Sequence, residues 1–227
     1  MTGSGKSNFM TWLLERLDHS PHVIYDTKHD DKFLRLPRSR LVHSFDAIED
    51  ALDDLTADYI VFRPNIYDAH DPDVLDGMLV HHHLNWPEVG AVIDELYPFH
   101  SGGRAGPGLT ALYTRGRSRG QTTIGGVQRP AWINRSAITE AQTINSFLLS
   151  DEDDRKTMGR IVPGLKHLPP PKPHHFYNYR IGDQAPRLIK PVPLVGGIDP
   201  GYTDKAPSEP NGEARTQSSI RHVWIGR

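Results

Sequence analysis

The residues with the clearest chemical role stand at the start of the chain, where the motif TGSGKS comprises Thr2, Gly3, Ser4, Gly5, Lys6 and Ser7. Glycines let consecutive backbone N–H groups approach an anion, and the N-terminus of a following helix adds its dipole. In the pattern G-x-x-x-x-G-K-[ST], the lysine contacts the β- and γ-phosphates and the hydroxyl binds Mg²⁺. We therefore predict that this loop binds the phosphates of ATP, with Ser7 on Mg²⁺. A glycine-serine terminus without function is the alternative, but the amphipathic pattern that follows at once favours the loop.

Two adjacent acids supply the second half of such a site. Asp94 and Glu95 follow the apolar run in VGAVIDEL, residues 89–96. We predict that Asp94 orients Mg²⁺ through water, and that Glu95 is the general base for the water that attacks the γ-phosphate. Two solvated carboxylates at a strand end are the alternative, and a phosphate loop in the same chain favours the catalytic role.

Further polar residues fit ATP hydrolysis less specifically. Gln128 follows the apolar run TTIGGV, where it can sense the γ-phosphate or act only as a turn residue. Arg115, Arg117 and Arg119 alternate near the end of a predicted helix. An arginine can stabilise the charge of a phosphoryl-transfer transition state, often from a neighbouring subunit. It can also complement the dipole at a helix C-terminus, and for any single one of the three arginines this second interpretation is the favoured one.

Apolar periodicity predicts the elements that must position these residues. The patterns indicate helices over 6–17, 45–55, 71–83 and 108–120, and strands over 22–26, 59–64, 89–96 and 122–130. Alternation of this kind predicts a mostly parallel sheet with helices on both faces, an α/β fold. Three adjacent residues on a helix point in different directions, so His81, His82 and His83 are expected to be a solvated helix end rather than a metal site.

Length and composition limit the remaining possibilities. The 227 residues suit one α/β domain, which we divide into a core over 1–165, C-terminal strands over 166–195 that pack on it, and a largely disordered tail over 196–227. The absence of cysteine excludes disulfides and thiolate metal sites. No apolar run approaches the length of a membrane span and the N-terminus does not have a signal-peptide pattern, so we expect a cytoplasmic location.

Five motifs in sequence order resemble those of the FtsK/HerA superfamily of ring-forming, DNA-translocating ATPases: TGSGKS, VIYDTK, VGAVIDEL, TRGRSRG and GGVQRP. The later SFLLSDEDDRKTMGRIV also looks like the next element of that family, and the resemblance covers about residues 1–180. Among its members, the chain is most similar to the small genome-packaging ATPases of membrane-containing and related viruses.

The resemblance implies a fold, an activity and partners. The fold would be a RecA-like (ASCE) P-loop NTPase, with Gln128 as the sensor glutamine and Arg117 as the finger that acts on a neighbouring subunit's ATP. Asp26 and Lys28 match a D-x-K motif that would support the site. A homo-oligomer, a hexameric ring, would use ATP and Mg²⁺ to move double-stranded DNA into a capsid. It would dock on capsid vertex proteins, in the host cytoplasm or at the virion vertex.

The chain departs from this family at its beginning. Family loops commonly contain G-x-T-G-x-G-K-S, so the first glycine and the strand before it have no counterpart ahead of Met1. We expect Met1 to be an internal methionine of a longer reading frame. The first strand of the sheet is then missing from the chain as given.

A local excess of arginine suggests DNA contacts. Between Leu96 and Thr139 there is no Asp or Glu, although the net charge of the whole chain is −2. Arg104 and Arg119 in this stretch are candidates for neutralising DNA phosphates without sequence preference. The loop 100–108, HSGGRAGPG, is either a mobile pore loop or a solvated surface loop.

Other functions remain open from the sequence. One is a cellular or plasmid translocase of the same superfamily, which neighbouring genes would distinguish. The other is a nucleotide-binding or interaction protein that does not hydrolyse ATP because its loop is incomplete. A DNA-stimulated ATPase assay separates it from the motor.

Overall fold

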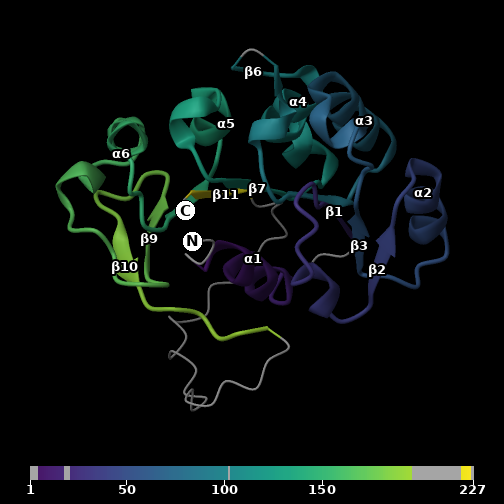
Figure 1. The fold of residues 1–227 in the computed structure, drawn as a ribbon, viewed down its shortest axis with the longest axis horizontal. Coiled ribbons are helices and arrows are strands. Elements are labelled where there is room, and N and C mark those ends of the chain that lie inside the picture. Colours follow the sequence, from purple (N-terminus) through teal and green to yellow (C-terminus); the bar gives the residue numbers. More distant parts are fainter. Residues whose placement is uncertain (1–4, 18–20, 102, 196–220, 226–227) are drawn as a thin grey trace.

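The chain forms one large sheet covered by helices, and the computed structural model describes residues 5–17, 21–101, 103–195 and 221–225 (Figure 1). The strands of the nine-stranded sheet lie in the order β10-β9-β8-β11-β7-β4-β1-β3-β2. Their bounds are β1 (His22–Tyr25), β2 (Ser39–Val42), β3 (Tyr59–Phe62), β4 (Gly90–Ile93), β7 (Thr123–Val127), β8 (Thr143–Ser146), β9 (Phe176–Arg180), β10 (Arg187–Ile189) and β11 (Arg221–Ile225).

A separate two-stranded hairpin follows β4. It consists of β5 (His100–Ser101) and β6 (Arg104–Ala105), which pair antiparallel. The α-helices are α1 (Lys6–Leu14), α2 (Phe45–Asp53), α3 (Pro72–Asn85), α4 (Pro107–Arg115), α5 (Arg135–Thr139) and α6 (Glu152–Gly159). Short 3₁₀ helices are η1 (Phe33–Arg35), η2 (Asp68–His70), η3 (Tyr97–Phe99), η4 (Gly116–Arg119), η5 (Pro130–Trp132) and η6 (Leu165–His167).

The sheet is mostly parallel, as the alternation of strands and helices predicts. Every neighbouring pair from β2 across to β8 is parallel, whereas β9 pairs antiparallel with β8 and β10 pairs antiparallel with β9. All residues of β1, β3, β4 and β7 are buried. Central parallel strands are covered on both faces, which explains why their sequences are continuous apolar runs.

Helices cover both faces of the sheet (Figure 1). On one face, Phe9, Met10 and Leu14 of α1 form a core with Ile24 of β1. On the other face α2, α3, α4, α5 and α6 lie side by side, and their apolar residues share a second core with Val23 and Tyr25 of β1. Successive strand residues point to opposite faces, so β1 contributes to both cores.

The C-terminal strand β11 lies inside the sheet, between β7 and β8 and parallel to both. Residues 196–220 of the expected tail lie outside the described residues, whereas residues 221–225 of the same segment form β11. The described residues show no gap between β7 and β8, because β11 pairs with both. The pattern RHVWI is short, and its partners are β7 and β8, far earlier in the sequence. Local periodicity therefore gave no reason to place it.

The expected C-terminal strands add to one edge of the sheet. Strands β9 and β10 fall within residues 166–195 and continue the sheet outward from β8. Within the described ranges, no helix is long and apolar enough to cross a membrane.

Candidate active site

Helix α1 begins at Lys6, directly after a glycine in a conformation that suits it. Gly5 has a φ of 93°, in the left-handed region that glycine adopts without strain. The Lys6 side chain is 6% exposed, its Nζ donates a hydrogen bond to the Asp94 backbone oxygen at 3.2 Å, and it lies 3.5 Å from Glu95 Oε2. The structure thus brings the predicted lysine to both predicted acids.

A glycine on β7 makes room for this lysine. A Cβ atom at Gly126 would lie 2.0 Å from the Asp94 backbone oxygen and 3.2 Å from Lys6 Nζ. A side chain at this position would therefore displace the lysine or push β4 and β7 apart. Of the predicted phosphate loop, Gly5, Lys6 and Ser7 are described, and Thr2, Gly3 and Ser4 lie outside the described residues.

Asp94 follows the last residue of β4 and is buried, with 1% of its surface exposed. Neither carboxylate oxygen accepts a hydrogen bond from the described residues. Burial raises the pKa of Asp94, and the nearby cations Lys6 and Lys28 oppose that rise. A buried carboxylate whose oxygens accept no hydrogen bond fits a metal-bound water, because Mg²⁺ keeps several waters and takes few protein ligands. The described residues contain no group of three or more His, Cys, Asp or Glu side chains that could hold a metal ion.

Besides Lys6, Glu95 has two closer partners. Its Oε2 lies 2.6 Å from Lys28 Nζ, and its Oε1 accepts a hydrogen bond from the Gln128 backbone N–H at 3.1 Å. Burial by itself lowers the pKa of Lys28, but Glu95 and Asp94 together outweigh it and the pKa is raised. For Lys6 burial is the stronger influence, so its pKa is lowered despite the same two acids.

Lys28 has a larger place in the site than its sequence motif indicated. We expected Asp26 and Lys28 only to support the site, and Asp26 does so. Its Oδ2 pairs with Arg63 Nε at 2.8 Å and its Oδ1 accepts from the Asp30 backbone N–H at 2.9 Å, which fixes the turn after β1. Lys28, carried by that turn, contacts Glu95 directly. The only sequence signal was its position two residues after a strand-ending acid.

Gln128 lies next to Glu95, because it follows the end of β7 and β7 pairs with β4. The next residue, Arg129, has a structural role. Its Nε lies 2.8 Å from Asp154 Oδ2 and a terminal nitrogen lies 3.0 Å from Asp151 Oδ2, and its guanidinium stacks over the Trp132 ring. These contacts tie the exit of β7 to the start of α6.

The predicted arginine finger lies at the opposite edge of the sheet from Lys6. Arg117 is exposed on η4, which precedes the amino end of β7. Its neighbour Arg119 accepts a backbone hydrogen bond from Glu88, just before the amino end of β4, and one of its guanidinium nitrogens donates to the Leu84 oxygen at 2.8 Å. The structure therefore does not bring Arg117 or Arg119 to the acids of the same chain.

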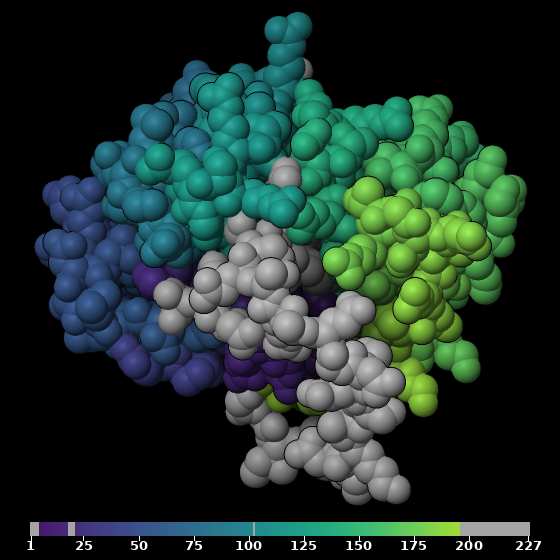
Figure 2. All heavy atoms as spheres, turned by 180° about the vertical axis from the view of Figure 1, so that it is seen from behind, coloured from purple at the N-terminus to yellow at the C-terminus, as the bar shows by residue number. Residues whose placement is uncertain are grey.

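Arg104 belongs to a protruding feature. It is exposed on β6, and the β5–β6 hairpin projects from the body of the molecule in both views (Figures 1 and 2). The expected loop 100–108 thus contains a hairpin whose charged residue faces solvent.

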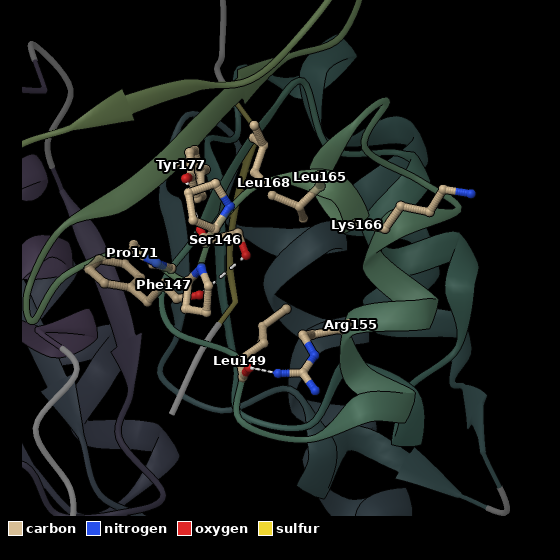
Figure 3. A pocket seen from close by; sticks show the side chains of 11 residues that line it. Ser146, Phe147, Leu149, Arg155, Leu165, Lys166, Leu168, Pro171 and Tyr177 are labelled. Carbon is tan, nitrogen blue, oxygen red and sulfur yellow. Dashed lines mark hydrogen bonds between the residues drawn. The ribbon is translucent and has the colours of Figure 1, made fainter.

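A pocket of about 230 Å³ adjoins the phosphate loop on the β8 side. Phe147, one of its lining residues, directly follows β8, and its ring lies 3.6 Å from the position of a Cβ atom at Gly5. The other walls are mainly Leu149, Leu168, Tyr177 and the prolines at 169–171 (Figure 3). Arg155 donates to the Leu149 oxygen at 3.4 Å, and the Lys166 side chain points away from the cavity (Figure 3).

The run of histidines is not a solvated helix end. His82 is fully buried and His83 is 7% exposed, so that expectation is wrong for both. His82 bonds to the Tyr25 hydroxyl and to the Val89 oxygen, and His83 bonds to Gln121 Oε1. They face inward because α3 packs on the sheet and on α4 at this end.

The chain is similar to two proteins that package viral genomes, one by sequence and one by fold. The chain is 28% identical over 214 residues to the DNA packaging ATPase P9 of enterobacteria phage PRD1, with 87% of this chain and 86% of P9 covered. The genome packaging NTPase B204 of Sulfolobus turreted icosahedral virus 2, in complex with ATP-gammaS, superposes with a TM-score of 0.65 at 18% identity, covering 84% of this chain and 94% of that chain. Its complex with AMPPCP gives a TM-score of 0.61, also at 18% identity. No family model matches the chain.

Proposed function

We propose that this chain, a homologue of the DNA packaging ATPase P9 and of the genome packaging NTPase B204, is itself an ATPase that packages viral DNA. The observation that carries the proposal is the contact of Lys6 with Asp94 and Glu95. Lys6 starts α1, and the two acids follow the carboxyl end of β4, next to β7. This is the arrangement of a phosphate-binding lysine and the acids that serve a metal and a water. The homologues supply the class of substrate, because their names specify DNA or genome packaging.

The phosphates of ATP would lie at the N-terminus of α1. Lys6 would contact the β- and γ-phosphates, and backbone N–H groups of Thr2, Gly3, Ser4 and Gly5 would surround them. The Ser7 hydroxyl and the Asp94 carboxylate would hold Mg²⁺, which supplies charge compensation at the phosphates. The buried, hydrogen-bond-free oxygens of Asp94 support this assignment.

Hydrolysis would depend on Glu95 and Gln128. Glu95 would accept a proton from the attacking water, and its contact with the Gln128 backbone would couple it to the strand that senses the γ-phosphate. Lys28 holds Glu95 at 2.6 Å in the structure described. The base must therefore exchange part of this ion pair for a water when the site becomes active.

The pocket beside Phe147 would receive the nucleoside. Lys6 lies beside β4 and β7, whereas Gly5 lies beside β8, so the phosphate chain would run from the acids toward β8. The apolar walls of the pocket suit a flat base, as in most nucleotide sites.

The motor would be a homo-oligomeric ring, which we propose to be a hexamer. Arg117 lies at the far edge of its own sheet, so it would reach the ATP of a neighbouring subunit, as the position of a finger in trans requires. The exposed Arg104 on the projecting hairpin would contact backbone phosphates of double-stranded DNA. Arg119 would add to this contact, although one of its nitrogens is bonded to Leu84. Capsid vertex proteins would dock the ring, in the host cytoplasm or at the virion vertex.

A DNA-stimulated ATPase assay tests the proposal. Glu95→Gln should still bind ATP but hydrolyse it on the order of a hundred-fold or more slowly, since general-base catalysis contributes that much. Glu49→Gln, at an exposed glutamate on α2, is the matched control and should keep full activity. ATP binding without any hydrolysis by the unmodified chain would favour the non-hydrolysing alternative. Equal rates for Glu95→Gln and the unmodified chain would contradict the role of Glu95.

A further inference from the structure

The strand next to the phosphate-binding loop comes from the opposite end of the sequence. β11 lies between β7 and β8 and is parallel to both. Its last residue, Ile225, pairs with Val127 on β7 and with Ser146 on β8. The carboxyl end of β11 therefore lies at the same edge of the sheet as the residues that follow β7 and β8.

Helix α1 starts at this place. A Cβ atom at Gly5 would lie 3.6 Å from Phe147, the residue directly after β8. A Cβ atom at Gly126 would lie 3.2 Å from Lys6 Nζ, and Gly126 is the partner of Trp224 in the β7–β11 pair. Gly5 and Lys6 thus lie beside the two strands that flank β11, and Figure 1 shows β11 next to the start of α1. The carboxyl end of β11 thus lies between the two strands against which α1 begins.

The C-terminal and N-terminal sequences, read one after the other, contain a full phosphate-loop pattern. Gly226 and Arg227 follow β11, and Thr2 to Ser7 lead into α1. In this spatial order they give G-R-T-G-S-G-K-S, which matches G-x-x-x-x-G-K-[ST] at every fixed position and leaves only Met1 over. Glycine is about 7% of residues on average, so one glycine by itself would have little weight. Gly226 is stronger evidence than its residue type alone, because it follows β11. This strand lies between β7 and β8, beside the start of α1.

We infer that β11 is the strand that carries the phosphate-binding loop, so that the C-terminal residues and the N-terminal residues of this chain together form one nucleoside triphosphate site. In sequence, Gly226 supplies the first glycine of the pattern G-x-x-x-x-G-K-[ST]. The fold is then a circular permutation of a fold in which strand, loop and helix are contiguous. The inference rests on the proposed function only in taking a nucleoside triphosphate as the ligand.

The slot between β7 and β8 admits one strand. β11 already pairs with both neighbours along nearly its whole length, over the registers His222 to Ile225 on β8 and Arg221 to Ile225 on β7. A strand encoded ahead of Met1 would have to displace β11 from this slot. The inference and the expectation of an upstream first strand are therefore distinguishable by experiment.

The first experiment moves the strand. We compare the full chain, a chain without residues 221–227, and a reordered chain in which residues 221–227 stand directly before Thr2 and the chain ends at residue 220. The readouts are the midpoint of thermal unfolding and the affinity for ATP with Mg²⁺. The truncated chain should unfold at a lower temperature and bind ATP at least ten-fold more weakly. The reordered chain should regain both values, because its loop is continuous.

A smaller change separates the loop from the strand. Deletion of Gly226 and Arg227 alone keeps β11, so the unfolding midpoint should stay within the error of the full chain. ATP affinity should fall roughly 10- to 100-fold, as expected when hydrogen bonds to a charged group are lost. This variant keeps the test decisive even where the truncated chain does not fold.

Several results would overturn the inference. They are a truncated chain with unchanged stability and ATP affinity, a reordered chain no better than the truncated one, and a Gly226-Arg227 deletion that binds ATP like the full chain.

Failure of the inference and failure of the proposed function give different results. If the full chain hydrolyses ATP and the truncation changes nothing, the function stands and the inference fails. If none of the chains binds ATP but the reordered chain regains the stability that truncation removes, β11 is the strand ahead of α1 and the ATPase proposal fails.

Discussion

At the scale of single residues, the site contains two buried acids whose negative charges are compensated by two lysines. Lys6 and Lys28 both lie near Asp94 and Glu95, and Asp94 and Lys6 are almost fully buried. A buried carboxylate that loses its cation keeps the cost of desolvation without compensation. The two lysines therefore stabilise the two acids in the folded protein.

Lys28→Met should destabilise the protein by about 2 kcal/mol at pH 7. This value is smaller than the cost of breaking a fully buried ion pair, because the Lys28 side chain is 33% exposed and solvent screens it. The raised pKa of Lys28 means that the contribution is fully present below its ordinary value of 10.5 and is lost as the pH rises through the raised value. Urea unfolding measures the loss, and Lys32→Met, at an exposed lysine of the same loop, is the control. Equal stability of the two variants would show that Lys28 does not compensate Glu95.

At the scale of elements, buried polar side chains join the helices to the sheet. His82 links α3 to β1 through the Tyr25 hydroxyl at 3.0 Å and to the residue before β4 through the Val89 oxygen at 3.1 Å. Asp76 of α3 accepts hydrogen bonds from the backbone N–H groups of Gly108 and Leu109, both at 2.9 Å, and so binds the first turn of α4. Neither role is visible in an apolar periodicity, because both residues are polar.

The stability of the protein should fall as the pH decreases from about 6.5 to about 4. Burial lowers the pKa of His82 to about 4, so in this range the unfolded chain binds a proton that the folded chain does not. The loss should reach about 3 kcal/mol. Urea unfolding at pH 7 and pH 4 measures it. The difference should shrink in His82→Gln and persist in His70→Gln, an exposed control. A pH dependence equal in both variants would assign the effect to other groups.

Asp76→Ala should cost about 2 kcal/mol of stability. Two backbone N–H groups at the start of α4 would lose their shared charged acceptor inside the protein, where water does not replace it. Asp73→Ala is the control, because Asp73 is an exposed residue in the first turn of the same helix. Thermal or urea unfolding measures both. If both variants lost the same small amount of stability, the hydrogen bonds from Asp76 to α4 would not stabilise the protein.

At the scale of the whole molecule, the proposed catalytic groups lie at two opposite edges of the sheet. The carboxyl edge holds Lys6, Lys28, Asp94, Glu95 and Gln128, whereas η4 with Arg117 lies at the amino edge. A rigid sheet cannot bring these edges together. Hydrolysis that needs Arg117 must therefore take place between subunits.

Arg117→Ala and Glu95→Gln should each be inactive alone and should complement each other when mixed. In a randomly mixed ring, about a quarter of the interfaces have an intact Glu95 on one side and an intact Arg117 on the other. The ATPase rate of the mixture should recover in that proportion. Arg115→Ala, at an exposed arginine in the last turn of α4, should remain active alone. A mixture as inactive as its components would place the finger elsewhere.

The sequence by itself determined the residue types of the site and the class of the fold. Lys6, Asp94 and Glu95 belong to short motifs next to apolar runs, and such signals are local, so periodicity and spacing sufficed to identify them. Only the tertiary structure decided that β11 fills the slot between β7 and β8, that Lys28 is the partner of Glu95, and that Arg117 lies at the far edge. These facts depend on contacts between residues far apart in the chain, such as the 67 positions between Lys28 and Glu95. Strand pairing and ion pairing of this kind are set by packing in three dimensions, which no local pattern records.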